Sequence, residues 1–189
     1  MRAREFVRPA ARSQAACSAL GRAREGDGAA LAELLARSRD RVLTVCCRLL
    51  GDRADGEDAA QEAMLKVALH LHELKEEEQF GSWCWRIAHR ICMDRLRTGR
   101  RRQGLLAARR EPAGESAEER TVGRMVVRQI LAAMPDDMSE ALILREMEGQ
   151  PYSEIARRLA VPLGTAKSRL HAARRRFRRD YLKAMQEEG

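Results

Sequence analysis

Basic side chains gather near the carboxyl end of the chain, at a density that suits contact with phosphates. Between Lys167 and Lys183 there are eight Lys or Arg residues and one acid, Asp180. Guanidinium and ammonium groups spaced along one helix neutralise the backbone of DNA and hold the helix in its major groove. A charge run of this kind is often no more than a solvated helix face, so its neighbours decide between the two interpretations.

Two predicted helices with a tight turn between them carry this basic run. Ser153–Leu159 forms the first helix, and Val161-Pro162 interrupts the register before the second, because proline fits the first position of a new helix. The basic side chains lie off the apolar face of the second helix, so the pair is typical of a helix-turn-helix that binds DNA. Its predicted buried stripe, at steps of three and four, is Leu163, Ala166, Leu170, Ala173, Phe177 and Tyr181.

An acidic segment in the first half of the chain has two apolar faces. From Asp55 to Glu78 there are eight acids and two lysines, and we expect a helix over Asp55–Glu77. Apolar anchors beside hydrogen-bonding groups are typical of a protein interface, and a helix buried on two sides of its own domain is the alternative. The expected core stripe is Ala60, Ala63, Met64, Val67, Leu71 and Leu74, and the second face is Asp58, Gln61, Glu62, Leu65 and Leu69.

A third element, expected over Phe80–Arg97, combines aromatic residues with arginines. From Asp94 to Arg110 there are seven arginines and one aspartate. Aromatic rings can stack on bases while arginines hold phosphates. We expect one of the two tryptophans to pack in the core, with Ile87, Ile91 and Leu96. The face expected to meet nucleic acid is Trp83, Arg86, His89, Arg90 and Arg97.

The remaining segments also read as helix, so the predicted fold class is all-α. We expect a flexible arm at 1–24, a helical domain at 25–102, a flexible linker at 103–121 and a helix-turn-helix domain at 122–185. The linker prediction rests on a shift to Gly, Arg and Glu with few bulky apolar residues.

The bulk composition agrees with a nucleic-acid-binding protein. The chain has 189 residues, enough for two small domains, and a net charge of +8, which favours a polyanionic partner. No run approaches the length of a membrane span, and the basic N-terminus lacks the apolar core of a signal peptide. We therefore expect a cytoplasmic protein with no direct membrane insertion.

The cysteines leave a second class of function open. Five of them, an odd number without a CxxC pair, are typical of small core residues in a reducing compartment: Cys17, Cys46, Cys47, Cys84 and Cys92. The alternative is a metal-dependent or thiol-dependent sensor, since His89 and Cys92 could lie on one helical face with Cys46 or Cys47 as a third ligand. Adjacent cysteines point in different directions, so we expect no metal and no cofactor.

Taken together, two stretches resemble sigma-70-type transcription initiation factors. The sequence DGEDAAQEAMLKVALHLHEL followed by FGSWCWRIAHRICMDRLRTGRRR resembles sigma region 2, and SEIARRLAVPLGTAKSRLHAARRRF with the helix before it resembles region 4. The resemblance covers roughly 25–183. The short connection and the lack of other regions are similar to the extracytoplasmic-function (ECF) group.

This resemblance implies a role for each surface. The acidic helix would bind the clamp helices of the large subunit of core RNA polymerase, and the tryptophan helix would recognise and melt the −10 promoter element. The basic helix would bind the −35 element; the chain would perform no catalysis, and an anti-sigma factor would hold it inactive. The implied −35 residues are Arg145, Tyr152, Thr165, Lys167, Ser168, Arg169, His171, Arg174, Arg175 and Arg178.

Some residues depart from the pattern that the resemblance implies. Arg90 stands where the family usually has asparagine, which suggests a phosphate contact in place of a base contact. Ala160 stands where glycine is common. Ala172 removes a possible −35 contact and leaves base recognition to Lys167, Ser168 and His171.

A regulator that binds DNA through a helix-turn-helix without polymerase is the other open alternative. Such proteins end in a similar motif, but they lack an acidic DxxQE helix followed by a tryptophan-containing basic helix. The order of the acidic and aromatic elements therefore favours the initiation factor.

Overall fold

The computed structural model describes residues 18–106 and 115–187, and every regular element in these ranges is helical. The α-helices are α2 (Ala19–Arg24), α3 (Gly28–Leu50), α4 (Arg53–Leu69), α5 (Phe80–Leu106), α6 (Glu115–Ala133), α7 (Asp136–Glu146), α8 (Tyr152–Leu159) and α9 (Leu163–Glu187). Two short 3-10 helices, η1 (Leu71–Glu73) and η2 (Glu77–Gln79), connect α4 to α5. None of the described helices combines the length and the apolarity needed to cross a membrane.

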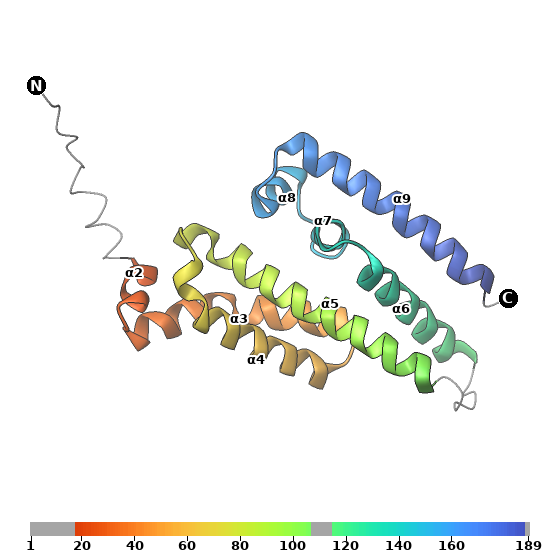
Figure 1. Ribbon diagram of the computed structural model, residues 1–189, viewed down its shortest axis with the longest axis horizontal. Helices are drawn as coiled ribbons and strands as arrows, with labels where there is room; N and C mark the ends of the chain where they lie inside the picture. Colours follow the sequence, from red (N-terminus) through yellow and green to blue (C-terminus); the bar gives the residue numbers. More distant parts are fainter. Residues whose placement is uncertain (1–17, 107–114, 188–189) are drawn as a thin grey trace, which may run out of the picture.

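The first domain, α2 to α5, packs three helices against one another with α2 at one end (Figure 1). Asp27 begins α3 by accepting hydrogen bonds from the backbone of Ala29 and Ala30, a standard N-terminal cap. Gly51 ends α3 at a φ of 73°, and Asp52 then caps α4. The close approach of α3 and α4 requires Gly56, where a Cβ would lie 2.5 Å from the sulfur of Cys47.

Two expectations for this domain are wrong at their edges. Residues 18–24 do not belong to a flexible arm, because Ala19 and Leu20 of α2 are buried and the Leu20 amide donates to Glu77 Oε2 at 3.0 Å; residues 1–17 lie outside the described range. The acidic helix ends at Leu69 rather than Glu77. The chain bends at His70, and Leu71 and Leu74 reach the core from η1 and the turn after it.

The predicted linker is also largely helical. Helix α5 continues to Leu106 and α6 begins at Glu115, so residues 103–106 and 115–121 belong to helices. Arginine, glutamine, glutamate and leucine are good helix formers, and their propensity outweighs the shortage of apolar residues that suggested a linker. Residues 107–114 lie outside the described range.

The second domain, α6 to α9, contains the helix-turn-helix. Pro151 precedes α8, and α8 ends at Ala160, which has a φ of 52°. This left-handed conformation favours glycine, so the backbone of Ala160 is strained at the turn. Among the residues that the structure describes, Ala160 is the non-glycine residue with a positive φ. Ile155 of α8 and Leu170 of α9 are fully buried between the helices, which confirms the helix-turn-helix prediction.

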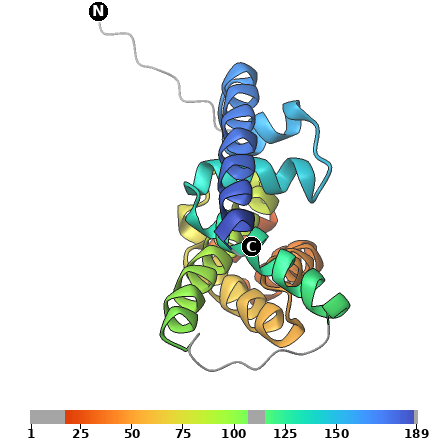
Figure 2. The ribbon, with the colours of Figure 1, turned by 90° about the vertical axis from the view of Figure 1, so that its right-hand side faces the viewer.

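The two domains pack on each other along α5. Helix α6 lies beside the second half of α5, and α7, seen end-on in Figure 1, lies between α5 and α9. Figure 2 shows α9 running down the page, above the helices of the first domain. One continuous apolar core runs from Leu34 and Trp85 of the first domain to Ile130 and Leu144 of the second.

Candidate nucleic-acid interface

The outer face of α9 presents a row of polar and basic side chains. Ala166, Leu170 and Ala173 are fully buried, and the side of the helix opposite them faces solvent. Leu163 does not extend the buried stripe as expected: it is 44% exposed. The exposed residues of the row are Thr165, Lys167, Ser168, His171, Arg174, Arg175 and Arg178.

The first turn of α9 is ordered by a local hydrogen bond. The hydroxyl of Ser168 donates to the carbonyl of Thr165 at 3.0 Å. Lys167, one residue before, is exposed. Residues at the N-terminal end of a recognition helix are those that reach base edges, so this turn can read sequence.

A charged network supports the middle of α9. Arg174 forms an ion pair with Glu146 of α7 at 2.6 Å and donates to the Tyr152 hydroxyl at 3.5 Å. The guanidinium of Arg145 stacks over the Tyr152 ring, 5.1 Å from its centroid, and donates to the carbonyl of Gln150. The contact between Arg145 and Tyr152 fixes the Tyr152 hydroxyl, which in turn positions Arg174. In the absence of DNA, Arg174 is paired with the carboxylate of Glu146.

Arg169 lies on a different side of α9 from the exposed row. Its Nε is 3.1 Å from Asp137 of α7, and its side chain is 22% exposed. The expectation that Arg169 faces DNA is therefore wrong in this structure, since α7 covers that side of α9. Arg169 was expected there only because the resemblance to sigma region 4 implied it.

The two tryptophans of α5 divide as expected. Trp85 is 2% exposed and belongs to the core. Trp83 is half-buried and packs against Phe80, with ring centroids 6.4 Å apart. Trp83 therefore keeps one side available to a ligand.

His89 does not face nucleic acid, contrary to the sequence-based expectation. It is fully buried, and its ring stacks on Trp85 with centroids 5.2 Å apart. Its Nε2 lies 3.1 Å from the hydroxyl of Ser139 in α7, and its Nδ1 lies 3.7 Å from Glu140. Burial lowers the pKa of His89 to about 4, so it is uncharged at neutral pH and the Glu140 contact is no ion pair.

Arg97 is also turned toward the second domain. It pairs with Asp136 of α7 at 2.5 Å, donates to the carbonyl of Ala132 at 2.8 Å and contacts Asp94 of its own helix at 3.1 Å. Its expected role in contacting DNA is therefore blocked in this conformation. Arg90 remains exposed, whereas Arg86 is half-buried.

The second face of α4 is uncovered. Leu65 is 60% exposed and Leu69 is 64% exposed, and Asp58 and Gln61 lie on the same side of the helix. The alternative interpretation, in which this face is buried within its own domain, is therefore excluded. Exposed leucines in a row are unusual unless a partner covers them.

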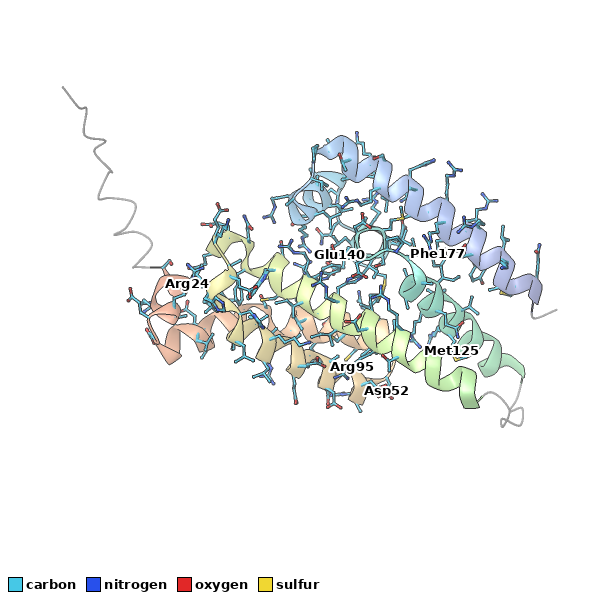
Figure 3. All side chains as sticks on the ribbon, in the orientation of Figure 1. Arg24, Asp52, Arg95, Met125, Glu140 and Phe177 are labelled. Carbon is cyan, nitrogen blue, oxygen red and sulfur yellow. The ribbon has the colours of Figure 1, made fainter. Side chains whose placement is uncertain are left out.

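Glu62 lies at the border of that face. It forms ion pairs with Lys66 at 2.9 Å and with Arg95 of α5 at 3.0 Å. These hydrogen bonds, the one with Lys66 first, lower the pKa of Glu62. Glu62 is thus held in place by Arg95 of α5, which is labelled in Figure 3.

The cysteines behave as core residues. Cys46, Cys84 and Cys92 are buried, and burial raises the pKa of Cys84 to about 12. Within the described ranges no group of three or more metal-binding side chains comes together. Cys17 lies outside these ranges. His89 faces Ser139 of α7, so the proposed His89–Cys92 pair gains no third ligand here.

The polar face of α7 and the turn after it carry contacts that the sequence did not predict. Asp136, Ser139, Glu140 and Glu148 all approach the first domain. The signal available was Pro135 followed by two aspartates, which reads only as a helix start. Nothing in the local pattern indicates which helix those side chains meet.

Known proteins share both halves of this chain. The sigma-70 region 2 family model matches residues 34–102, and the sigma-70 region 4 model matches residues 124–177. The ECF RNA polymerase sigma factor SigW of Bacillus subtilis is 25% identical over 170 residues, which are 82% of this chain and 91% of SigW. SigK of Mycobacterium tuberculosis is 31% identical over 160 residues, which are 80% of this chain and 86% of SigK.

A solved structure aligns with most of the chain. The sigma factor RpoE from Bartonella quintana, in complex with the anti-sigma factor NepR, has a TM-score of 0.47 and 19% identity, and the alignment covers 79% of this chain and 94% of RpoE. The two matched regions and the relatives of similar length agree on one assignment. The chain belongs to the sigma-70 family of transcription initiation factors, in the ECF group that directs RNA polymerase to promoters.

Proposed function

We propose that three surfaces of this sigma factor divide the work of initiation. The α4 face binds the clamp helices of core RNA polymerase, the exposed side of α5 binds and melts the −10 element, and the outer row of α9 binds the −35 element. The chain itself performs no catalysis. It acts in the cytoplasm, where polymerase and DNA are present.

The observation that carries this proposal is the uncovered α4 face. Leu65 and Leu69 are each more than half exposed, and Asp58 and Gln61 beside them have no charged partner within the described residues. An exposed apolar pair rimmed by polar side chains is typical of a surface that a partner protein covers. Glu62, which α5 already holds, extends this face without needing to be reoriented.

The α9 row supports the DNA-binding half of the proposal. Lys167, His171, Arg175 and Arg178 point to solvent, and no ion pair engages them in the described part of the chain. Thr165 and Ser168 begin the row, and Arg174 joins it through the Tyr152 network. A positive row on a helix whose opposite side is buried fits the major groove.

Binding to core polymerase tests the proposal. The variant Leu65→Ala/Leu69→Ala should bind purified core polymerase at least tenfold more weakly, since truncating central interface residues costs about 2 kcal/mol or more. Leu182→Ala is the matched control, because Leu182 is a similarly exposed leucine on α9, at 52%. Unchanged affinity of the double variant, with thermal stability also unchanged, would remove the α4 assignment.

An anti-sigma factor is the further partner that we propose. RpoE of Bartonella quintana was solved with one, and this chain has the same two-region organisation. Purification of the chain from its own cells, followed by identification of co-purified proteins, tests this part separately. A chain that is recovered only with polymerase would contradict it.

A further inference from the structure

Arg174 differs from the other basic residues of the α9 row because a carboxylate of its own domain holds it. We propose that Glu146, the last residue of α7, competes with the DNA backbone for Arg174 and thereby limits how tightly the chain binds DNA. The proposal rests on the proposed role of the α9 row in binding the −35 element. It adds an acidic residue that regulates this binding.

The guanidinium of Arg174 binds Glu146 through one of its edges. Its Nε and Nη2 both donate to Oε1 of Glu146, at 3.0 and 2.6 Å. Two N–H groups side by side are what an arginine offers to a phosphate in a bidentate contact. A phosphate can therefore use this edge only when the carboxylate leaves it.

The third nitrogen of Arg174 also has a partner. Its Nη1 lies 3.5 Å from the hydroxyl of Tyr152, whose ring is fixed by the guanidinium of Arg145, 5.1 Å from the ring centroid. Arg174 is thus held against α7 and α8, and α7 lies beside α9 in Figure 1. Arg175 and Arg178 of the same row are exposed, and no ion pair engages them among the residues that the structure describes.

The position of Glu146 on α7 indicates that its charge does not serve the helix itself. The C-terminal end of a helix carries a partial negative charge, which disfavours an acidic side chain in the last turn. The carboxylate of Glu146 adds to this charge, and the two together attract Arg174. A neutral residue in place of Glu146 should therefore leave α7 folded and free the guanidinium.

The pair is open to exchange with DNA. The side chain of Arg174 is 46% exposed and that of Glu146 is 51% exposed, so a DNA backbone can reach both. Exchanging a carboxylate for a phosphate gains less free energy than a phosphate contact to an unpaired arginine. Because binding to non-specific DNA is almost wholly electrostatic, Glu146 restrains this binding in particular.

Binding of the full chain to duplex DNA tests the proposal. The variant Glu146→Gln removes the charge and keeps the size of the side chain. Its affinity is measured by fluorescence anisotropy, at about 50 to 200 mM salt, for a labelled duplex whose −35 element is selected from a randomised library. Circular dichroism melting checks that the variant folds like the wild-type chain.

Asp180→Asn is the matched control. Asp180 also lies beside two arginines of α9, Arg179 at 2.7 Å and Arg176 at 3.6 Å, and neither arginine belongs to the row. The control therefore removes the same charge from the same region without freeing a residue of the row. Its affinity and its salt dependence should stay close to those of the wild-type chain.

Glu146→Gln should bind the duplex about two- to fivefold more tightly at the lowest salt, the range that an exposed ion pair contributes. The slope of log affinity against log salt should become steeper by about 0.9, because one more phosphate is neutralised. An unchanged affinity would overturn the proposal. A lower affinity would overturn it too, since Glu146 would then position Arg174 for DNA.

A double-mutant cycle shows whether Glu146 acts through Arg174 or only repels DNA by its charge. In a chain that also carries Arg174→Ala, Glu146→Gln should gain nothing, because the cation that it frees is absent. A gain that persists without Arg174, or an equal gain in Asp180→Asn, would reveal general charge repulsion and contradict the proposal.

Arg178→Ala and Lys167→Ala separate a failure of this proposal from a failure of the proposed function. Both residues belong to the row and lack a carboxylate partner among the described residues. If neither variant changes the affinity for the duplex, the α9 row does not bind DNA and both proposals fall. If they weaken binding while Glu146→Gln gains nothing, the competition by Glu146 alone is refuted.

Discussion

The hydroxyl of Ser139 lies 3.1 Å from Nε2 of His89, and this contact joins α7 of the second domain to the helix that carries both tryptophans. His89 is fully buried between Trp85 and α7. Glu140, one residue after Ser139, lies 3.7 Å from the other ring nitrogen. The two titratable groups therefore share one environment, yet burial shifts their pKa values in opposite directions.

The buried imidazole should make the folded chain less stable in mild acid. Because the pKa of His89 is lowered to about 4, the unfolded chain binds a proton near its ordinary value of about 6.5 while the folded chain does not. The contribution of His89 leaves the free energy of unfolding at its full value above pH 6.5. As the pH falls toward 4, the free energy of unfolding decreases by up to about 3 kcal/mol. Chemical unfolding of the Glu140→Gln variant at pH 7, 6 and 5 checks this, because that variant lacks the opposing titration of Glu140.

His89→Gln is the control for that measurement. It keeps a polar group beside Ser139 but has nothing to titrate, so in a chain that also carries Glu140→Gln the decline between pH 7 and 5 should disappear. In NMR spectra of the wild-type chain, the His89 ring signals should stay constant over this range. A His89 signal that titrates near pH 6.5 would show that α7 does not cover the ring.

Glu140 should act in the opposite direction. Burial raises the pKa of Glu140 to about 7, against the partly compensating charges of Arg86 and Arg90. The folded chain therefore holds a proton that the unfolded chain releases at about pH 4.5. Protonation of Glu140 therefore stabilises the folded chain in acid, and this stabilisation is lost as the pH rises through 7.

Glu140→Gln measures that contribution. The variant should be more stable than the wild-type chain by about 1–3 kcal/mol at pH 8, where Glu140 is ionised, with little difference at pH 5. Because His89 and Glu140 oppose each other, the wild-type chain should depend less on pH between 5 and 7 than either variant. Equal stability of Glu140→Gln and wild type at pH 8 would contradict the burial of this carboxylate.

The turn of the helix-turn-helix should gain stability from glycine. Ala160 has a φ of 52°, where a Cβ is strained. Relief of this strain in Ala160→Gly should therefore raise the free energy of unfolding by about 0.5–1 kcal/mol. The greater conformational entropy that glycine gives the unfolded chain offsets part of this gain. Gly149→Ala is the reciprocal control: its φ is 67° and a Cβ there would meet no neighbouring atom, so it should destabilise the chain by a similar amount. Thermal unfolding compares the two, and a loss of stability in Ala160→Gly would refute the argument.

The row on α9 should divide into residues that read bases and residues that hold phosphates. Lys167→Ala should change which −35 sequences are preferred, at about 1–3 kcal/mol for a lost base contact. Arg178→Ala, three turns further along, should weaken binding to all sequences and reduce the salt slope by about one. Transcription by each holoenzyme from a library with a randomised −35 element measures both. An even loss across the library for Lys167→Ala would make Lys167 a phosphate contact.

The sequence by itself determined the elements and their apolar faces. The recurrence of Ala166, Leu170 and Ala173 predicts the buried side of α9, and Leu65 and Leu69 predict a second face on α4; both agree with the observed burial. These inferences succeed because side chains three and four residues apart share one side of a helix, whatever surrounds it.

The tertiary structure decided which of those faces is covered, and by what. His89 and Arg97 lie on a polar face of α5, but their partners Ser139 and Asp136 are 50 and 39 residues away in the sequence. The resemblance implied that Arg169 contacts DNA, but Arg169 pairs with Asp137 of α7. Helical periodicity carries no information about such distant contacts, because they depend on how the two domains pack along α5 and not on any local pattern.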